Sequence, residues 1–181
     1  MSSRFDLVVE EVNFLVDEAA RVRETGPHFA IIHRWHEPGS RCLAGEEVAQ
    51  VRFMSGGEGF PLKLGLGPLI MFDYLARHRW LPRNASCLAA EMNADPFCMS
   101  HGANAPGSRK QTRKFTHGSI KVFAQRIRDA MKLAFRKAEV ALDPHLVLIS
   151  EPGYRLMARA DWIHLIDERL VRSDRSRDES I

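Results

Sequence analysis

Features typical of membrane and secreted proteins are missing from this sequence. No apolar run approaches the roughly 18 residues that a membrane-spanning helix needs, and no basic segment followed by an apolar stretch opens the chain. The 181 residues include only three cysteines, Cys42, Cys87 and Cys98, whose odd number and irregular spacing do not resemble a disulfide framework. These absences predict a cytoplasmic protein with reduced cysteines and no membrane contact.

Signatures of enzymes and of metal sites are also missing. The sequence has no glycine-rich phosphate loop followed by Lys-Ser/Thr, no nucleophile elbow, and no grouped carboxylates or Ser/His/Asp set. Cys98 and His101 form one Cys-x-x-His pair, whereas a structural zinc ion normally needs four ligands in two close pairs. The other candidate ligands are irregularly spaced: His28, His33, His36 and Cys42. We therefore expect no catalytic residue, no metal ion and no cofactor, and we do not expect an enzyme.

Positive charge is concentrated in one segment. The whole chain carries 26 basic and 23 acidic residues, a net charge of only +3. Between Arg109 and Lys137, however, ten lysines and arginines accompany a single acid, Asp129. Phosphate contacts dominate affinity for nucleic acids, so this segment predicts a nucleic-acid partner. The alternative is a solvated helix face that only keeps the protein soluble.

The first third of the chain is expected to form a helix and then a small antiparallel sheet. Residues 5–24 have apolar residues at helical spacing, and Gly26-Pro27 ends that helix. Residues 29–32 and 48–54 have strand character, and residues 60–64 can return as another strand after a glycine-rich loop.

Three further helices and a hairpin are expected after Gly65. The helices cover residues 68 to about 79, residues 85–92 with Asn84 as N-cap, and residues 117–140. Residues 93–116 form a long connection rich in Gly, Pro, Ser and Asn. The predicted C-terminal elements are strands at 145–150 and 154–158 around a turn at 151–153, a last helix at 161–172, and a polar tail at 173–181.

The helix over 117–140 is strongly amphipathic. Its apolar face comprises Ile120, Phe123, Ala124, Ile127, Met131 and Ala134. Polar residues step by three or four along the opposite side, so we expect them to project together: Lys121, Gln125, Arg128, Lys132 and Arg136.

Three stretches resemble the DNA-binding domain of OmpR/PhoB-type response regulators, over roughly residues 46–159. VRFMSGGEGFPLKL is similar to the family's strand–turn–strand unit, SIKVFAQRIRDAM to its recognition helix, and LVLISEPGYRLMA to its wing hairpin, which ends in Gly-Tyr-Arg-Leu. The resemblance implies an α+β winged helix-turn-helix with N-terminal antiparallel strands, a three-helix core and a C-terminal hairpin wing, to which this chain adds terminal helices.

The sequence departs from that family at several points. Gly65 replaces the threonine that caps the family's first helix, and Glu151-Pro152 occupies the wing tip, where a basic residue or glycine is usual. The loop before the recognition helix is longer and carries four basic residues. The 45 residues ahead of the domain are too few for a phosphoreceiver domain, so we expect control by a signal other than an aspartyl phosphate.

The expected function is sequence-specific binding of double-stranded DNA by a transcriptional regulator, with residues 117–140 in the major groove. Lys121 suits guanine acceptors, Gln125 suits adenine, and Arg128 suits guanine or a phosphate. The expected DNA-binding residues are Ser119, Lys121, Gln125, Arg126, Arg128 and Lys132 in the helix, Arg109, Lys110, Arg113 and Lys114 in the loop, and Arg155 in the wing.

Three parts of the chain are assigned different roles. Residues 1–45 form an N-terminal helix and linker, residues 46–160 the DNA-binding domain, and residues 161–181 a C-terminal helix and tail. The stripe of Val8, Val12, Leu15, Ala19 and Val22 suits a two-helix seam, which favours a homodimer. The alternative is that this stripe packs on the chain's own winged helix. In the resembling family the loop before the recognition helix can touch RNA polymerase, which makes polymerase a candidate partner, but the four basic residues of this loop favour phosphate.

Two other functions are compatible with the sequence. One is a winged-helix interaction module that recruits polymerase or another regulator. The other is an architectural or replication-associated DNA binder.

Overall fold

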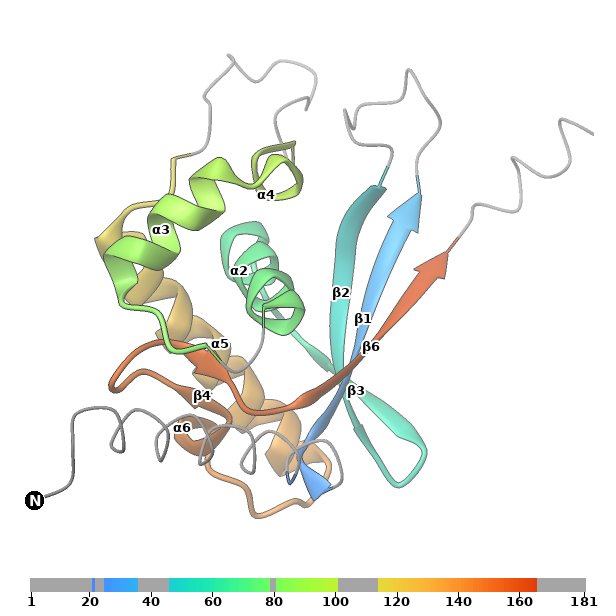
Figure 1. Ribbon diagram of the computed structural model, residues 1–181. Coiled ribbons are helices and arrows are strands. Elements are labelled where there is room, and N and C mark those ends of the chain that lie inside the picture. The colour runs from blue at the N-terminus through green and yellow to red at the C-terminus, as the bar shows by residue number, and fades with distance from the viewer. Residues whose placement is uncertain (1–20, 22–24, 36–45, 79–80, 101–113, 166–181) are drawn as a thin grey trace, which may run out of the picture.

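The computed structural model describes residues 21, 25–35, 46–78, 81–100 and 114–165 (Figure 1). The named elements in chain order are β1 (His28–Trp35), β2 (Glu46–Ser55), β3 (Glu58–Leu62), α2 (Leu66–Arg77), α3 (Ala85–Ala94), α4 (Pro96–Ser100), α5 (His117–Lys137), α6 (Pro144–Val147), β4 (Leu148–Ile149), β5 (Arg155–Leu156) and β6 (Arg159–Leu165).

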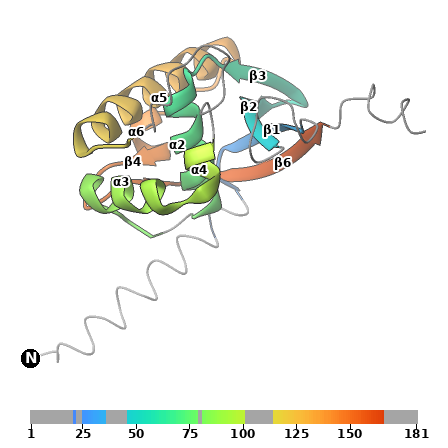
Figure 2. The same ribbon diagram turned by 90° about the horizontal axis from the view of Figure 1, so that it is seen from above.

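The main sheet has four strands in the order β3-β2-β1-β6. β1 and β2 pair antiparallel, as do β2 and β3, whereas β1 and β6 pair parallel, so the sheet is mixed. The helices gather on one side of this sheet in both views (Figures 1 and 2). The fold is therefore α+β, with a helical layer against one sheet face and a separate two-stranded hairpin, β4–β5.

The β2–β3 hairpin forms where the glycine-rich loop predicts it. Ser55 pairs with Glu58, so the connection contains only Gly56 and Gly57. Their φ angles are +58° and +83°, in the left-handed region that two-residue hairpin turns require and that glycine adopts without steric cost.

The core lies between the sheet and the helices. Phe29 of β1 packs edge-on against Phe72 of α2, with ring centroids 5.2 Å apart, and Phe53 of β2 packs against Phe135 of α5 at 4.7 Å. Where α2 meets α5, Gly67 is in close contact with the ring of Phe123, because a Cβ there would lie 2.5 Å from a ring carbon. These aromatic contacts thus join the sheet and the helices into one core.

A short backbone pairing connects the start of α3 with the β4–β5 hairpin. The predicted N-cap is confirmed, since Asn84 Oδ1 accepts a hydrogen bond of 2.8 Å from Cys87 N. Just before it, Arg83 forms an antiparallel bridge with Tyr154 through two backbone hydrogen bonds. Tyr154 is buried and belongs to the hydrophobic core.

The helix predicted at 161–172 is wrong over its described part. Residues 159–165 form β6, the edge strand beside β1. Ala160 is buried and Trp162 half-buried, whereas Asp161 and Ile163 are exposed, which is the alternation of a strand. The backbone of β1 supplies the hydrogen bonds that decide this pairing, and those partners come from the other end of the chain.

The strand predicted at 145–150 is mostly wrong as well. Residues 144–147 form the short helix α6, and only Leu148 and Ile149 are extended. Asp143 Oδ1 accepts a hydrogen bond of 2.9 Å from His145 N, and Pro144 occupies the first turn. An Asp-Pro pair starts a helix as readily as it ends one, because Pro needs no N–H partner at that position.

The connection predicted at 93–116 is ordered at both described ends. Asp95 Oδ1 accepts hydrogen bonds from Phe97 N and Cys98 N and so begins α4, a helix that the sequence did not predict. The side chain of Asn93 bonds both the N–H and the carbonyl of Phe115, each at 2.8 Å. This contact holds the two ends of the connection together.

The sheet extends beyond residues 46–160 in both directions, because β1 precedes that range and β6 continues past it. Residues 28–35 and 159–165 therefore share one sheet with β2 and β3. The dimerisation stripe of the predicted helix at 5–24 and the tail at 173–181 lie outside the described residues. None of the described helices combines the length and the apolar composition of a membrane-spanning segment.

Candidate nucleic-acid interface

The candidate interface is built on α5, whose first turn is closed by a capping box. Ser119 N donates to Thr116 Oγ1 at 3.2 Å, and Thr116 N donates to Ser119 Oγ at 2.8 Å. The Ser119 hydroxyl also donates to the Thr116 carbonyl at 2.8 Å. Ser119, expected to contact DNA, thus uses its side chain to begin the helix.

One face of α5 is exposed and strongly cationic. Ile120, Ala124, Ile127, Met131 and Ala134 are buried, as predicted for the apolar face. The exposed charged residues are Lys121, Arg126, Lys132, Arg136 and Lys137, with Asp129 as the one acid of the helix. α5 packs against α2, α3 and the β2–β3 hairpin, so its exposed side is turned away from the core.

Arg128 is not part of this face, which corrects the prediction for that residue. It is 8% exposed, and its Nε and Nη2 donate to the carbonyl of Leu148 at 3.0 and 2.8 Å. The guanidinium therefore fastens β4 to α5 and is not presented to a base or phosphate. Arg128 lies at the border of the apolar face, where the aliphatic part of an arginine side chain can pack while its charged end finds a carbonyl.

Gln125 and Asp129 form a pair on the exposed face. Gln125 Nε2 donates to Asp129 Oδ1 at 2.9 Å, one helical turn away. Both residues are exposed. The bond sets the orientation of the Gln125 amide on a helix whose backbone is fixed by the core.

The other predicted contact residues have varied positions. Lys114 is exposed just ahead of α5, and Arg155 is half-buried on β5. Arg109, Lys110 and Arg113 lie outside the described residues. The described part of the interface is therefore α5 with Lys114 at its N-terminal side.

A pocket of about 270 Å³ adjoins α5 where the chain returns toward α6. It contains two carboxylates beside its cationic side chains, so its charge favours neither an anion nor a cation. Its lining residues are Gln125, Arg128, Asp129, Lys132, Leu142, Asp143, Pro144 and His145.

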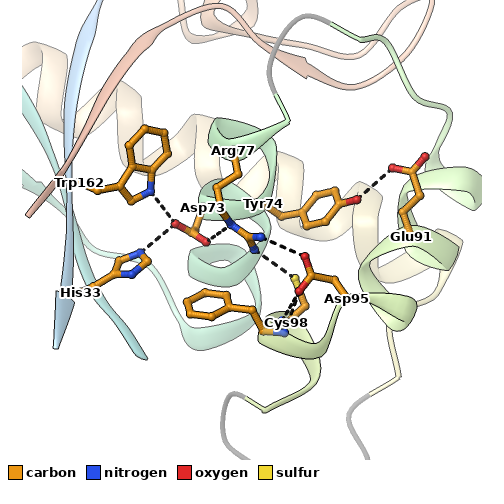
Figure 3. A network of polar contacts seen from close by, with 9 residues as sticks. His33, Asp73, Tyr74, Arg77, Glu91, Asp95, Cys98 and Trp162 are labelled. Atoms are coloured by element: carbon orange, nitrogen blue, oxygen red, sulfur yellow. Dashed lines mark hydrogen bonds and ion pairs between the residues drawn. The ribbon is translucent and has the colours of Figure 1, made fainter. Parts of the chain in front are cut away.

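A buried polar network lies behind the interface, between the sheet and α2 (Figure 3). Asp73, with no exposed surface, accepts hydrogen bonds at Oδ1 from His33 Nε2 at 3.0 Å and from Trp162 Nε1 at 3.1 Å. Its Oδ2 accepts from Arg77 Nε at 2.9 Å, and Arg77 Nη1 donates to Asp95 at 3.0 Å. One carboxylate thus connects β1, β6 and α2, and Arg77 extends the connection to α4.

The electrostatics of this network follow from its burial. Desolvation acts to raise the pKa of Asp73, but the hydrogen bond from His33 and the charge of Arg77 outweigh it and hold that pKa below its usual value. Cys98 beside Arg77 has a pKa raised to about 12, chiefly by desolvation. The carboxylate is therefore ionised and the thiol protonated at neutral pH.

A second polar chain leads from α2 to the hairpin. Tyr74 Oη donates to Glu91 Oε2 at 3.2 Å, and Glu91 forms an ion pair with Arg83. Burial, together with the Glu91 charge, raises the pKa of Tyr74 to about 12. Since Arg83 also pairs with Tyr154, this chain ties α2 and α3 to the β4–β5 hairpin.

Sequence reasoning missed the Asp73 network, although one signal was present. Asp73 interrupts the apolar stretch of α2, LIMFDYLA, and a carboxylate within such a stretch is buried only when it is paired. Its partners come from β1 and β6, so no spacing along the chain indicates them.

The described residues contain no group of three His, Cys, Asp or Glu side chains that could hold a metal ion. No family model matches the chain, and neither a curated protein nor a solved structure is similar enough to it to count as a match. The geometry of α5 and its surroundings is therefore the basis for assigning a function.

Proposed function

We propose that the chain is a winged helix-turn-helix protein that binds double-stranded DNA through α5 and regulates transcription. The observation that carries this proposal is the exposed face of α5, where five cationic side chains accompany one carboxylate. A helix fits the major groove, and lysine and arginine beside it neutralise phosphates.

The surroundings of α5 support the same proposal. The helices α2 and α3 each pack against α5, and the β4–β5 hairpin follows α5 in the chain. The Arg83–Tyr154 bridge and the Arg128–Leu148 hydrogen bonds join this hairpin to the helices. A rigid base of this kind keeps a groove-binding helix in a fixed orientation.

The exposed residues of this region have different tasks in DNA binding. Arg126, Lys132 and Lys114 bind phosphates, while Gln125 and Lys121 face base edges. We further propose a second copy of the chain as a partner, paired through residues 5–24, which would bring two α5 helices to adjacent half-sites.

The test is duplex DNA binding by the full chain as a function of salt. If about six phosphates are neutralised, log K falls with log[salt] with a slope of roughly −5. Arg126→Ala and Lys132→Ala each reduce the steepness of that slope by about 1. Fluorescence anisotropy with a labelled duplex measures both quantities.

Arg34→Ala is the matched control. Arg34 is exposed near the end of β1, whose neighbours in the sheet are β2 and β6, so its removal leaves the slope unchanged. Binding that does not depend on salt, or an equal response of all three variants, would contradict a DNA-binding role for α5.

A second candidate function is docking of another protein on α5. Leu133, which is 54% exposed on that helix, favours this role because an apolar side chain contributes more to a protein contact than to a phosphate contact. If α5 docks another protein, Leu133→Ala weakens binding of that protein, and binding of duplex DNA is absent or independent of salt.

A further inference from the structure

Val122 is an apolar residue in the middle of the cationic face of α5. It is 49% exposed, so about half of its side chain has no packing partner in the fold. Its helical neighbours on that side, Gln125 and Arg126, are exposed as well. Since β-branched residues are not preferred on exposed helix faces, the fold does not account for valine at this position.

The amide of Gln125 is oriented by Asp129. The hydrogen bond from Gln125 Nε2 to Asp129 Oδ1 uses one amide hydrogen and leaves Oε1 and the second hydrogen available. This donor and acceptor match the N7 and N6 groups of adenine in the major groove. A carboxylate on a phosphate-binding face is unfavourable by itself because it repels phosphate. The hydrogen bond to Gln125 gives Asp129 a role, which is to position the Gln125 amide.

Val122 and Gln125 are three residues apart, about 4.5 Å along the helix axis. In helices that read the major groove, residues at this spacing contact successive bases. An exposed aliphatic group can pack against the C5-methyl group of thymine, which is unique to that base in DNA.

We infer that α5 reads an adenine and a thymine in neighbouring base pairs, with Gln125 held by Asp129 on the adenine and Val122 against the thymine methyl group. This inference rests on the proposed DNA-binding function and specifies its ligand. The same contacts discriminate DNA from RNA, because uracil lacks the methyl group.

The experiment uses the full chain and a duplex that the wild-type protein enriches from a random-sequence pool. Each thymine in that duplex is replaced in turn by uracil, which removes one methyl group. At one or two positions the wild-type protein binds about four-fold more weakly, the loss expected for one buried methyl group. In Val122→Ala the thymine and uracil duplexes bind equally, while Val122→Thr, which keeps one methyl group, retains the difference.

Leu133→Ala is the matched control, since it removes an exposed apolar side chain from the same helix and preserves the uracil effect. For Asp129 variants the measured quantity is the preference for adenine over other bases. Overall affinity does not serve, because removing an acid strengthens binding to every duplex alike. Asp129→Ala reduces the preference for adenine, whereas Asp129→Asn, which keeps an acceptor for Gln125, retains it. The double variant Gln125→Ala/Asp129→Ala has the same preference as Gln125→Ala alone.

The salt dependence tests DNA binding by α5, and the uracil effect tests base readout separately. Absence of salt-dependent binding to any duplex overturns both. Salt-dependent binding without sequence enrichment, or a uracil effect that survives in Val122→Ala, overturns only the readout. If the uracil effect survives in Val122→Ala, the exposed Val122 side chain is assigned to a contact with another protein.

Discussion

Arg128 and Lys132 are neighbours one turn apart on α5, and both are cationic, yet the structure gives them opposite roles. Arg128 is buried and donates two hydrogen bonds to the Leu148 carbonyl, whereas Lys132 is exposed. Helical spacing alone assigned both to the DNA-facing stripe. The difference arises because β4 passes beside one of them, which a helix pattern cannot indicate.

Replacing Arg128 by methionine is expected to lower the free energy of unfolding by about 1–3 kcal/mol, because the buried Leu148 carbonyl loses its donor. Lys132→Met, a change of similar size on the exposed face, should shift it by less than about 0.5 kcal/mol. Urea denaturation followed by circular dichroism measures both values. Equal effects would mean that Arg128 does not anchor the hairpin.

The described cysteines should differ sharply in reactivity. Cys87 is exposed on α3, whereas Cys98 is buried and its pKa is about 12. In a Cys42→Ser background, a thiol reagent at pH 8 should therefore modify one thiol rapidly and the second only after denaturant is added. Rapid modification of both thiols in the folded protein would show that Cys98 is accessible.

At the scale of the element, the first turn of α5 is stabilised by side-chain hydrogen bonds of a capping box and not by an acidic residue. Thr116 and Ser119 satisfy free N–H groups of the first turn and of the cap, although no acidic residue lies in that turn. The helix dipole would stabilise an acidic side chain in that turn, but the same side chain would repel a phosphate. The uncharged capping box is therefore consistent with the proposed DNA contact.

Thr116→Ala is expected to reduce the free energy of unfolding by about 1 kcal/mol, the usual effect of losing an N-cap hydroxyl. Thr116→Ser keeps the hydroxyl and should be close to wild type. The comparison is made by thermal and urea unfolding. A loss as large in Thr116→Ser as in Thr116→Ala would rule out the capping explanation.

At the scale of the whole molecule, the Asp73 network connects the first and the last described strands of the chain to the helical layer. His33 comes from β1 and Trp162 from β6, while Arg77 links α2 to α4 through Asp95. Each oxygen of the buried carboxylate has at least one donor, which is the condition for a stable buried charge.

Asp73→Asn is expected to lower the free energy of unfolding at pH 7 by about 3 kcal/mol, because Arg77 loses its buried counter-charge. The pKa of Asp73 is below its usual value, so the wild-type advantage is full above about pH 4, the unfolded pKa, and disappears as the pH falls through the lower folded pKa. Urea unfolding at a series of pH values measures it.

Asp161→Asn serves as the control for this prediction. Asp161 pairs with His28, but its side chain is 70% exposed, so the substitution should cost less than about 1 kcal/mol. A difference between wild type and Asp73→Asn that does not change with pH would exclude ionisation of Asp73 as its cause.

Local interactions along the chain account for the features that were predicted correctly. The two glycines of the β2–β3 turn, the Asn84 cap and the buried stripe of α5 were all predictable, because turn conformation, capping and helix periodicity are local. The concentration of charge around α5 is likewise a property of the sequence.

The remaining features arise from contacts between segments that are distant in the chain. Residues 159–165 became a strand because β1 lies beside them, and Arg128 was buried because β4 offers it a carbonyl. Asp73 joins residues that are far apart in the chain. These outcomes depend on hydrogen-bond partners that arrive only when distant segments pack, and no periodicity in a single segment encodes them.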